Sequence, residues 1–286
     1  MPRANSFEAF ADAVSKTYPR LSPQQQQIAQ FVLEHPDEVA LGTVATVAEQ
    51  TGVQPSALVR FANALDFGGF TEMQQVFRGR LLDRSSSYRE RIDAMRRAKA
   101  VPASGTGVLH QFVADGVAEL SQLEDNVRAD DLVAAADHIC RASRVHVLAQ
   151  RRAFPVASYL AYALAQLDVK VQLLDGVGGM LPDMLRQIGA GELLLVASFR
   201  NYSRDVIAAA EAAHRRGVVV VAITDSALSP LKPHASVCFE LGLGPNAAFR
   251  SLVAPLCLAQ ALVVGVGHRL VAPRRAGRAR ANGAKR

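Results

Sequence analysis

The sequence predicts an all-helical domain followed by a doubly wound α/β domain whose parallel sheet has five strands. Up to residue 82, apolar side chains recur at helical spacing, and prolines and glycines separate the helices. From residue 108 to 272, short apolar runs alternate with helical segments, which is typical of a parallel sheet covered on both faces. We expect domains at 1–82 and 108–272, joined by a linker at 83–107 and followed by a basic disordered tail at 273–286.

Caps and helix-breaking residues set the expected helix boundaries in the first domain. Ser22 and Pro23 predict a helix start, and Pro36 predicts the end of that helix, followed by a short turn. Thr43 is expected to cap the next helix, which ends at Gly52. The first domain is therefore expected to contain several short helices with apolar faces turned inward.

Residues 43–65 have the spacing of a helix-turn-helix. Ala48 is small where two helices would cross, Gly52 makes the turn, and Leu58 faces the core. The second helix would place its first residues in the major groove of DNA, where arginine and asparagine suit hydrogen bonds to base edges or phosphates. The alternative is an ordinary helical hairpin. The candidate DNA-binding residues, all expected to face outward from the second helix, are Gln54, Ser56, Ala57, Arg60 and Asn63.

The distribution of charge bears on binding to DNA. Residues 1–77 carry four cations and eight anions, a balance that disfavours contact with phosphates. Residues 78–99 carry eight cations and three anions, and the tail 273–286 carries six cations and no anion. These two basic segments would supply the attraction to DNA. For the tail, a solvated segment that aids solubility is the alternative.

Composition excludes several classes of protein. The longest apolar run, residues 252–266, is interrupted by Pro255 and Gln260 and is too short to span a bilayer. The N-terminus has no signal-peptide core. The cysteines lack zinc-ligand spacing and are too few for a disulfide framework. We therefore expect a cytoplasmic protein with reduced thiols, no metal, no cofactor and no membrane partner. The cysteines are Cys140, Cys238 and Cys257.

Apolar runs and helical patterns alternate along the second domain. We expect the first and third strands to be neighbours in the sheet. The expected strands are 145–148, 169–174, 193–197, 218–224 and 237–241. The expected helices are at about 108–126, 130–141, 153–167, 179–189, 203–216 and 247–271.

Basic and polar side chains follow the first and third of these strands. Ligands of open parallel sheets bind outside the carboxyl ends of the strands, and the N-terminus of a helix attracts anions. Clustering of arginines at two such ends predicts a site for a small anionic metabolite. Structural ion pairs, or arginines lying along apolar surface, are the alternative. The candidate effector-binding residues are Arg151, Arg152, Ser198, Arg200, Asn201 and Ser203.

Two stretches of sequence carry a resemblance to a known family. They are VRFANALDFGGF at 59–70 and RRGVVVVAITDSALSPLKPHASV at 215–237. With the order of the domains, they resemble the MurR/RpiR family of bacterial transcriptional regulators, in which a helix-turn-helix domain precedes a sugar-isomerase (SIS) domain. The resemblance implies a flavodoxin-like sheet, dimers or tetramers on palindromic DNA operators, and a SIS domain that senses a phosphosugar and usually has no catalysis of its own.

Two loops depart from the pattern of the family. Its Gly-x-Gly-x-Ser loop after the first strand is replaced by residues 149–153, and its Ser-x-Ser-Gly-x-Thr loop by residues 198–203. In the second loop, only Ser198 and the hydroxyl of Ser203 match the pattern of the family. Glycines let a backbone approach phosphate closely, so we expect guanidinium groups to replace that contact. Another anionic metabolite, such as a carboxylate, is then as well supported as a phosphosugar.

The combined interpretation is a DNA-binding transcriptional regulator, not an enzyme, that forms a homodimer or homotetramer. Gln54 and Ala57 stand where the family has a serine and a threonine, whereas Arg60 matches the arginine of the family. The alternative is a phosphosugar isomerase with an accessory N-terminal domain. Isomerisation needs a base near the sugar carbon, and Asp205 and Asp225 are interpreted as helix-start and strand-end residues instead. A SIS scaffold that binds only proteins is a third possibility.

Overall fold

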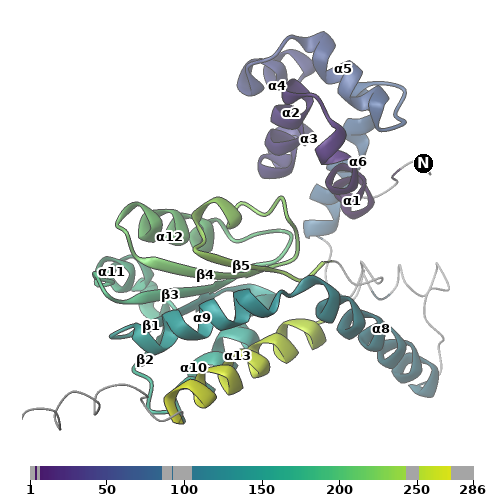
Figure 1. Cartoon of the computed structure of the whole chain (residues 1–286). Helices are drawn as coiled ribbons and strands as arrows, with labels where there is room; N and C mark the ends of the chain where they lie inside the picture. The colour runs from purple at the N-terminus through teal and green to yellow at the C-terminus, as the bar shows by residue number, and fades with distance from the viewer. Residues whose placement is uncertain (1–3, 5–6, 86–91, 93–104, 243–250, 272–286) are drawn as a thin grey trace, which may run out of the picture. The chain divides into compact units, whose positions relative to one another are not determined.

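The computed structural model of the chain describes residues 4, 7–85, 92, 105–242 and 251–271. The described chain divides into two compact units, one helical and one α/β (Figure 1). The predicted tail at 273–286, and most of the predicted linker at 83–107, lie outside the described residues.

The helical unit consists of short helices around an apolar core. Phe10, Phe61 and Phe77 are completely buried in that core, and the rings of Phe10 and Phe77 meet edge to face at 5.0 Å. Ser22 and Gln25 form a capping box at the start of α2, as the Ser-Pro pattern predicts. The helices are α1 (Phe7–Thr17), α2 (Pro23–Glu34), α3 (Pro36–Leu41), α4 (Val44–Thr51), α5 (Pro55–Ala64) and α6 (Phe70–Ser85), with a 3-10 turn η1 (Tyr18–Arg20).

The segment after Pro36 is a helix, so the prediction of a short turn there was wrong. Pro36 is the first residue of α3, where its missing N–H leaves no hydrogen bond unmade. Val39 and Ala40 of this helix are completely buried. The side chain of Gln74 in α6 donates hydrogen bonds to the carbonyl oxygens of Val39 and Gly42. Tertiary packing thus stabilises a helix too short to form by propensity.

The α/β unit contains a five-stranded sheet in the order β2-β1-β3-β4-β5, with all strands parallel, as predicted. Its strands are β1 (Val145–Ala149), β2 (Val171–Leu173), β3 (Leu193–Ala197), β4 (Val219–Thr224) and β5 (Val237–Glu240). Its helices are α9 (Ala129–Arg141), α10 (Phe154–Ala165), α11 (Leu181–Arg186), α12 (Arg204–Arg215) and α13 (Val253–Val271). Helix α8 (Gly105–Asn126) precedes α9, and its residues up to Ala118 group with the helical unit. The 3-10 turns of the α/β unit are η2 (Arg151–Ala153), η3 (Val177–Gly179) and η4 (Lys232–His234).

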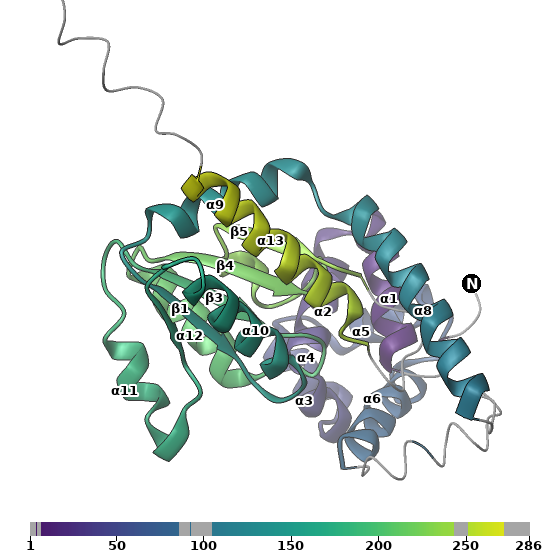
Figure 2. The same ribbon diagram turned by 90° about the horizontal axis from the view of Figure 1, so that it is seen from below.

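Helices cover both faces of the sheet. Helices α9, α10 and α13 lie on one face and α11 and α12 on the other (Figures 1 and 2). The strands alternate accordingly: Leu193 and Leu195 of β3 belong to the first core, whereas Leu194 belongs to the second. All five residues of β3 are buried, which explains why this strand is a continuous apolar run.

Helix α13 is the one described helix that is long and apolar enough to cross a membrane by length and composition. It is longer than the apolar run that the sequence suggested, because its last turn includes His268 and Arg269. Leu258, Leu262 and Val266 are buried in the core that α13 shares with α9 and α10. Packing within the domain therefore accounts for the apolar residues on one side of α13, whereas Val264 and Leu270 are exposed.

Candidate functional site

The α4–α5 pair has the geometry of a helix-turn-helix. Gly52 ends α4 with a φ of 71°, a left-handed conformation that glycine adopts without strain. Leu58 and Phe61 bury one face of α5 in the core of the unit. The opposite face is open to solvent, where Arg60 Nη1 lies 3.4 Å from Ser56 Oγ. The predicted DNA-binding residues that are exposed are Gln54, Ser56, Arg60 and Asn63.

Ala57 does not lie on the exposed face of α5, so its predicted outward position was wrong. It is only 3% exposed, because it precedes Leu58 and lies one turn from Phe61 on the inner face. Gln54 occupies the N-cap position of α5, and no side-chain hydrogen bond from it caps that helix among the described residues. Pro55 at the first helical position compensates in part for the weak cap.

In the α/β unit, the loops after β1 and β3 meet at the carboxyl edge of the sheet. Ala149 pairs with Ala197 at the ends of these adjacent parallel strands, which confirms that the first and third strands are neighbours. The side chain of Gln150 joins the two loops. Its Oε1 accepts a hydrogen bond from the hydroxyl of Ser203, and its Nε2 donates one to Asp205 Oδ2 at 3.1 Å.

The end of β4 supports the second of these loops. Asp225 Oδ2 accepts a hydrogen bond from the backbone N–H of Arg200 at 2.7 Å, and Oδ1 accepts one from the hydroxyl of Tyr202 at 2.8 Å. Ser198 Oγ accepts a bond from the N–H of Ser203 at 3.1 Å. Asp225 does stand at a strand end, as predicted, but it also holds the loop. No local pattern pointed to this role, which depends on the pairing of β3 with β4.

Arg151 and Asn201 adopt backbone conformations that suit glycine. Their φ angles are 55° and 69°, in the left-handed region that is costly for other residues. Arg151 stands at the second glycine of the first family loop, and Asn201 at the glycine of the second. Residues with side chains therefore stand at these two positions in a backbone conformation that glycine adopts without strain. Such strain persists only where the surrounding structure imposes it.

The three candidate arginines lie in different environments. Arg151 is exposed, whereas Arg200 is only 7% exposed. The guanidinium of Arg152 lies 5.0 Å from the centre of the Phe199 ring, close enough for a cation–π interaction. Asp205 and Asp225 at the same edge offset part of the positive charge of these arginines.

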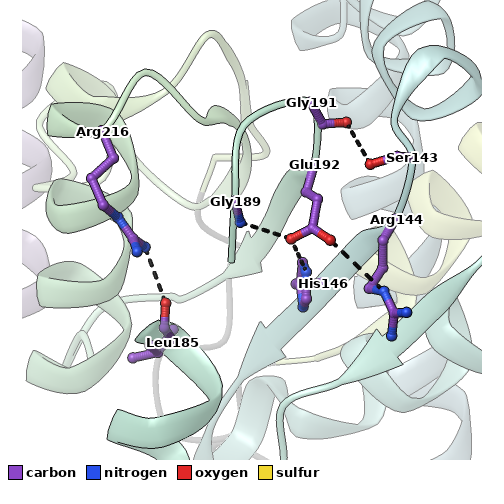
Figure 3. A network of polar contacts seen from close by, with 8 residues as sticks. All are labelled: Ser143, Arg144, His146, Leu185, Gly189, Gly191, Glu192 and Arg216. Atoms are coloured by element: carbon purple, nitrogen blue, oxygen red, sulfur yellow. Dashed lines mark hydrogen bonds and ion pairs between the residues drawn. The ribbon is translucent and has the colours of Figure 1, made fainter. Parts of the chain in front are cut away.

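A second polar cluster lies at the other end of the sheet (Figure 3). Glu192, just before β3, accepts hydrogen bonds from His146 Nε2 at 2.9 Å and from the N–H of Gly189 at 2.8 Å. Arg144 Nε lies 3.8 Å from Oε1, the other carboxylate oxygen of Glu192. Burial alone would raise the pKa of Glu192, but these donors together hold the pKa below its ordinary value. The cluster precedes β3, so it stands at the opposite edge from the loops that follow β1 and β3.

The cysteines and metal-binding residue types form no further site among the residues described. All three thiols are free, and burial raises the pKa of Cys238 to about 12, so that thiol stays protonated. No group of three or more histidine, cysteine, aspartate or glutamate side chains in the described ranges is arranged to hold a metal ion.

Comparison with known families accounts for both units. Residues 9–82 match the helix-turn-helix domain of the rpiR family, and residues 138–265 match the SIS domain. The chain belongs to the RpiR family of transcriptional regulators. In this family architecture, α4 and α5 form the helix-turn-helix, and the joined loops after β1 and β3 lie at the carboxyl edge of the SIS sheet.

Two solved structures are similar to this RpiR-family chain. The sugar isomerase domain of an RpiR transcription factor from Sphaerobacter thermophilus is 26% identical, with a TM-score of 0.54, and the match covers 57% of this chain and 90% of that one. The NanR protein of Vibrio vulnificus, solved with ManNAc-6P, is 20% identical, with a TM-score of 0.53 and coverage of 89% of both chains. The NanR likeness shows a shared fold across both units.

Proposed function

We propose that this RpiR-family protein is a DNA-binding transcriptional regulator whose SIS domain senses a small anionic metabolite, either a sugar phosphate or a carboxylate. The proposal that the SIS domain senses a ligand rests on one observation. The loops after β1 and β3, joined through Gln150 and Ser203, meet at the edge where open α/β sheets bind ligands. The similarity to NanR, which was solved with a phosphosugar, supports the same class of ligand.

Binding to DNA is assigned to the exposed face of α5. Arg60 and Asn63 carry the donors that suit base edges and phosphates, and Ser56 lies one turn before Arg60. A homodimer or homotetramer would present two such helices to the two halves of a palindromic operator. Operator DNA is the proposed macromolecular partner, and the protein would act in the cytoplasm.

Sensing is assigned to groups that favour an anion. The exposed guanidinium of Arg151 would supply charge, Ser203 a hydroxyl, and the first turn of α12 backbone N–H groups. Arg200, Arg152, Ser198 and Asn201 complete the proposed site. A ligand that binds there would change the relative positions of two helix-turn-helix domains and hence their fit to the operator.

Operator binding tests the proposal directly. Fluorescence anisotropy with a duplex from the region upstream of the protein's own gene should give salt-sensitive, sequence-dependent binding. Adding members of a panel of sugar phosphates and small carboxylates should shift that affinity for at least one of them, and Arg200→Ala should lose the shift while keeping operator affinity. Absence of sequence-dependent binding would contradict the regulator. A response to a neutral sugar alone would contradict the anion site.

We infer that the SIS domain has no isomerase activity. The carboxylates beside the joined loops, Asp205 and Asp225, already accept hydrogen bonds, Asp225 from Arg200 and Tyr202 and Asp205 from Gln150. The hydrogen-bonded pair of His146 and Glu192 belongs to the opposite edge. Incubation of the pure protein with the same sugar phosphates should leave them unchanged, and a new isomer in the mixture would overturn this inference.

A further inference from the structure

Ser203 stands at the N-cap position of α12 but does not cap that helix. A serine at this position ordinarily accepts a hydrogen bond from a backbone N–H of the first turn. Within the described chain, no side-chain cap is formed here, and the hydroxyl of Ser203 instead donates to Gln150 Oε1 across the gap between the two loops. The carboxamide of Gln150 therefore uses the hydroxyl that an anionic ligand at this helix would use.

Gln150 is anchored at both ends of its carboxamide. Its Oε1 accepts from Ser203, and its Nε2 donates to Asp205 Oδ2 at 3.1 Å in the first turn of α12. A carboxamide oxygen is a neutral acceptor with a geometry close to that of one oxygen of a carboxylate or phosphate. The side chain thus hydrogen-bonds two side chains at the start of α12, the hydroxyl of Ser203 and the carboxylate of Asp205.

We propose that Gln150 is an internal competitor that occupies the anion position of the SIS domain and that an effector must displace. This proposal rests on the proposed function, because it concerns the same site. A ligand oxygen that accepts from Ser203 has to replace Gln150 Oε1. Hydrogen bonds to ionised acceptors are roughly twice as strong as those to neutral acceptors, so an anion can displace the carboxamide whereas a neutral sugar hydroxyl gains nothing by the exchange.

Displacement of Gln150 also provides a route from ligand to structure. Gln150 directly precedes Arg151, whose backbone is held at a φ of 55°, and the two hydrogen bonds of Gln150 are contacts that join this turn to α12. Breaking these bonds frees the strained turn η2 to change conformation. Gln150 therefore sets the affinity that a ligand needs in order to bind. It also links binding of the ligand to the conformation of the loop after β1.

Titration with inorganic phosphate, followed by calorimetry, tests the role of Gln150. Gln150→Ala should bind phosphate about fivefold more tightly than wild type, because the competing hydrogen bond is gone. If Gln150→Ala does not fold, Gln150→Ser replaces it, and it should also bind phosphate more tightly than wild type. Gln150→Glu should lose phosphate binding, since a carboxylate beside Asp205 repels the anion. Gln166→Ala, an exposed glutamine at the end of α10, is the matched control and should match wild type.

The outcomes separate this proposal from the proposed function. Tighter binding by Gln150→Ala supports the competitor, whereas equal or weaker binding, as expected if Gln150 merely braces the loops, overturns it and leaves the anion site in place. Phosphate binding by neither protein overturns both the competitor and the anion site. In the Ser203→Ala background, Gln150→Ala should no longer raise the affinity, and a persistent gain would show that Gln150 acts elsewhere.

Discussion

At the scale of single residues, α5 shows how one helix divides its side chains between the core and solvent. Leu58 and Phe61 are completely buried, and Ala57 joins them because the inner face of a helix is wider than one row of residues. Arg60 and Asn63 are on the opposite side and are exposed. Under the proposed function, a substitution on this outer face should change DNA binding with little effect on the core.

Arg60→Ala should weaken operator binding by ~1–3 kcal/mol while the free energy of unfolding stays near that of wild type. Arg60 is exposed, and its Nη1 lies only within 3.4 Å of Ser56 Oγ, so its loss leaves no buried group unpaired. Fluorescence anisotropy measures the affinity, and denaturant unfolding measures the stability. Arg20→Ala, an exposed arginine of η1, is the control and should bind like wild type. Equal operator affinities for Arg60→Ala and wild type would exclude the contact.

Asp225→Asn should loosen the loop at 198–203. An asparagine offers one acceptor oxygen where the carboxylate has two, so either the N–H of Arg200 or the hydroxyl of Tyr202 loses its acceptor. The free energy of unfolding of the SIS domain should fall by ~1–3 kcal/mol, and the effector response should weaken while operator affinity is kept. Tyr202→Phe removes one of the two bonds and should give a smaller loss. Unchanged stability in both variants would refute the role of Asp225.

At the scale of elements, the turn between α4 and α5 depends on the backbone of Gly52. The φ of 71° is strained for alanine, although a Cβ there would meet only the side-chain amide of Gln27 at an ordinary 3.6 Å. Gly52→Ala should therefore lower the free energy of unfolding by ~1–2 kcal/mol. Gly79→Ala, inside α6 with nothing within 4 Å of the added Cβ, should instead raise it by up to ~1 kcal/mol. Thermal denaturation measures both changes, and a Gly52→Ala protein as stable as wild type would show that the φ of 71° carries no penalty.

The contact between β1 and the start of β3 predicts a dependence of stability on pH. The pKa of Glu192 is lowered in the folded protein, so the carboxylate favours folding above the ordinary pKa of 4.5 and this contribution is lost as the pH falls towards the folded pKa. Wild type should therefore lose more stability than Glu192→Gln between about pH 6 and pH 3. Urea unfolding at a series of pH values measures the difference. Glu211→Gln, on the outer part of α12, is the control and should follow wild type. Parallel curves for wild type and Glu192→Gln would contradict the contribution.

At the scale of the whole molecule, the arrangement of charge decides how the protein meets DNA. The chain carries a net charge of +6, yet residues 1–77, which hold α4 and α5, have more anions than cations. Specific contacts from α5 therefore need attraction from other segments to offset repulsion between this domain and phosphates. The basic segments at 78–99 and 273–286 are the regions of the sequence that can supply it.

Truncation after Ala272 should make operator binding less sensitive to salt. The removed segment carries six cations, and each phosphate that they neutralise steepens the fall of log affinity with log salt by roughly 0.9. The shortened protein should therefore show a flatter slope with the same preference for operator over unrelated DNA. Binding isotherms at four salt concentrations, on both duplexes, measure slope and preference together. An unchanged slope would assign the tail to solubility instead.

The sequence by itself determined the elements and their order. Helical spacing, caps such as Ser22-Pro23 and continuous apolar runs are local signals, and they predict the helix-turn-helix and the five parallel strands because each depends on neighbours a few residues away. The prediction of a turn after Pro36 was wrong because it used these local signals alone. Helix α3 is too short to show a helical period, and its formation depends on contacts with α6.

Only the tertiary structure decided which side chains meet. Gln150 reaches Ser203, and Asp225 reaches the N–H of Arg200, because the register of β1, β3 and β4 aligns strand ends that are far apart in the sequence. The sequence could place arginines at those ends. It did not indicate that a glutamine from the loop after β1 would hydrogen-bond the serine that begins α12. Partners across a sheet follow from strand pairing and packing, which no local pattern encodes, and so the hydrogen bonds that join these loops emerged only from the fold.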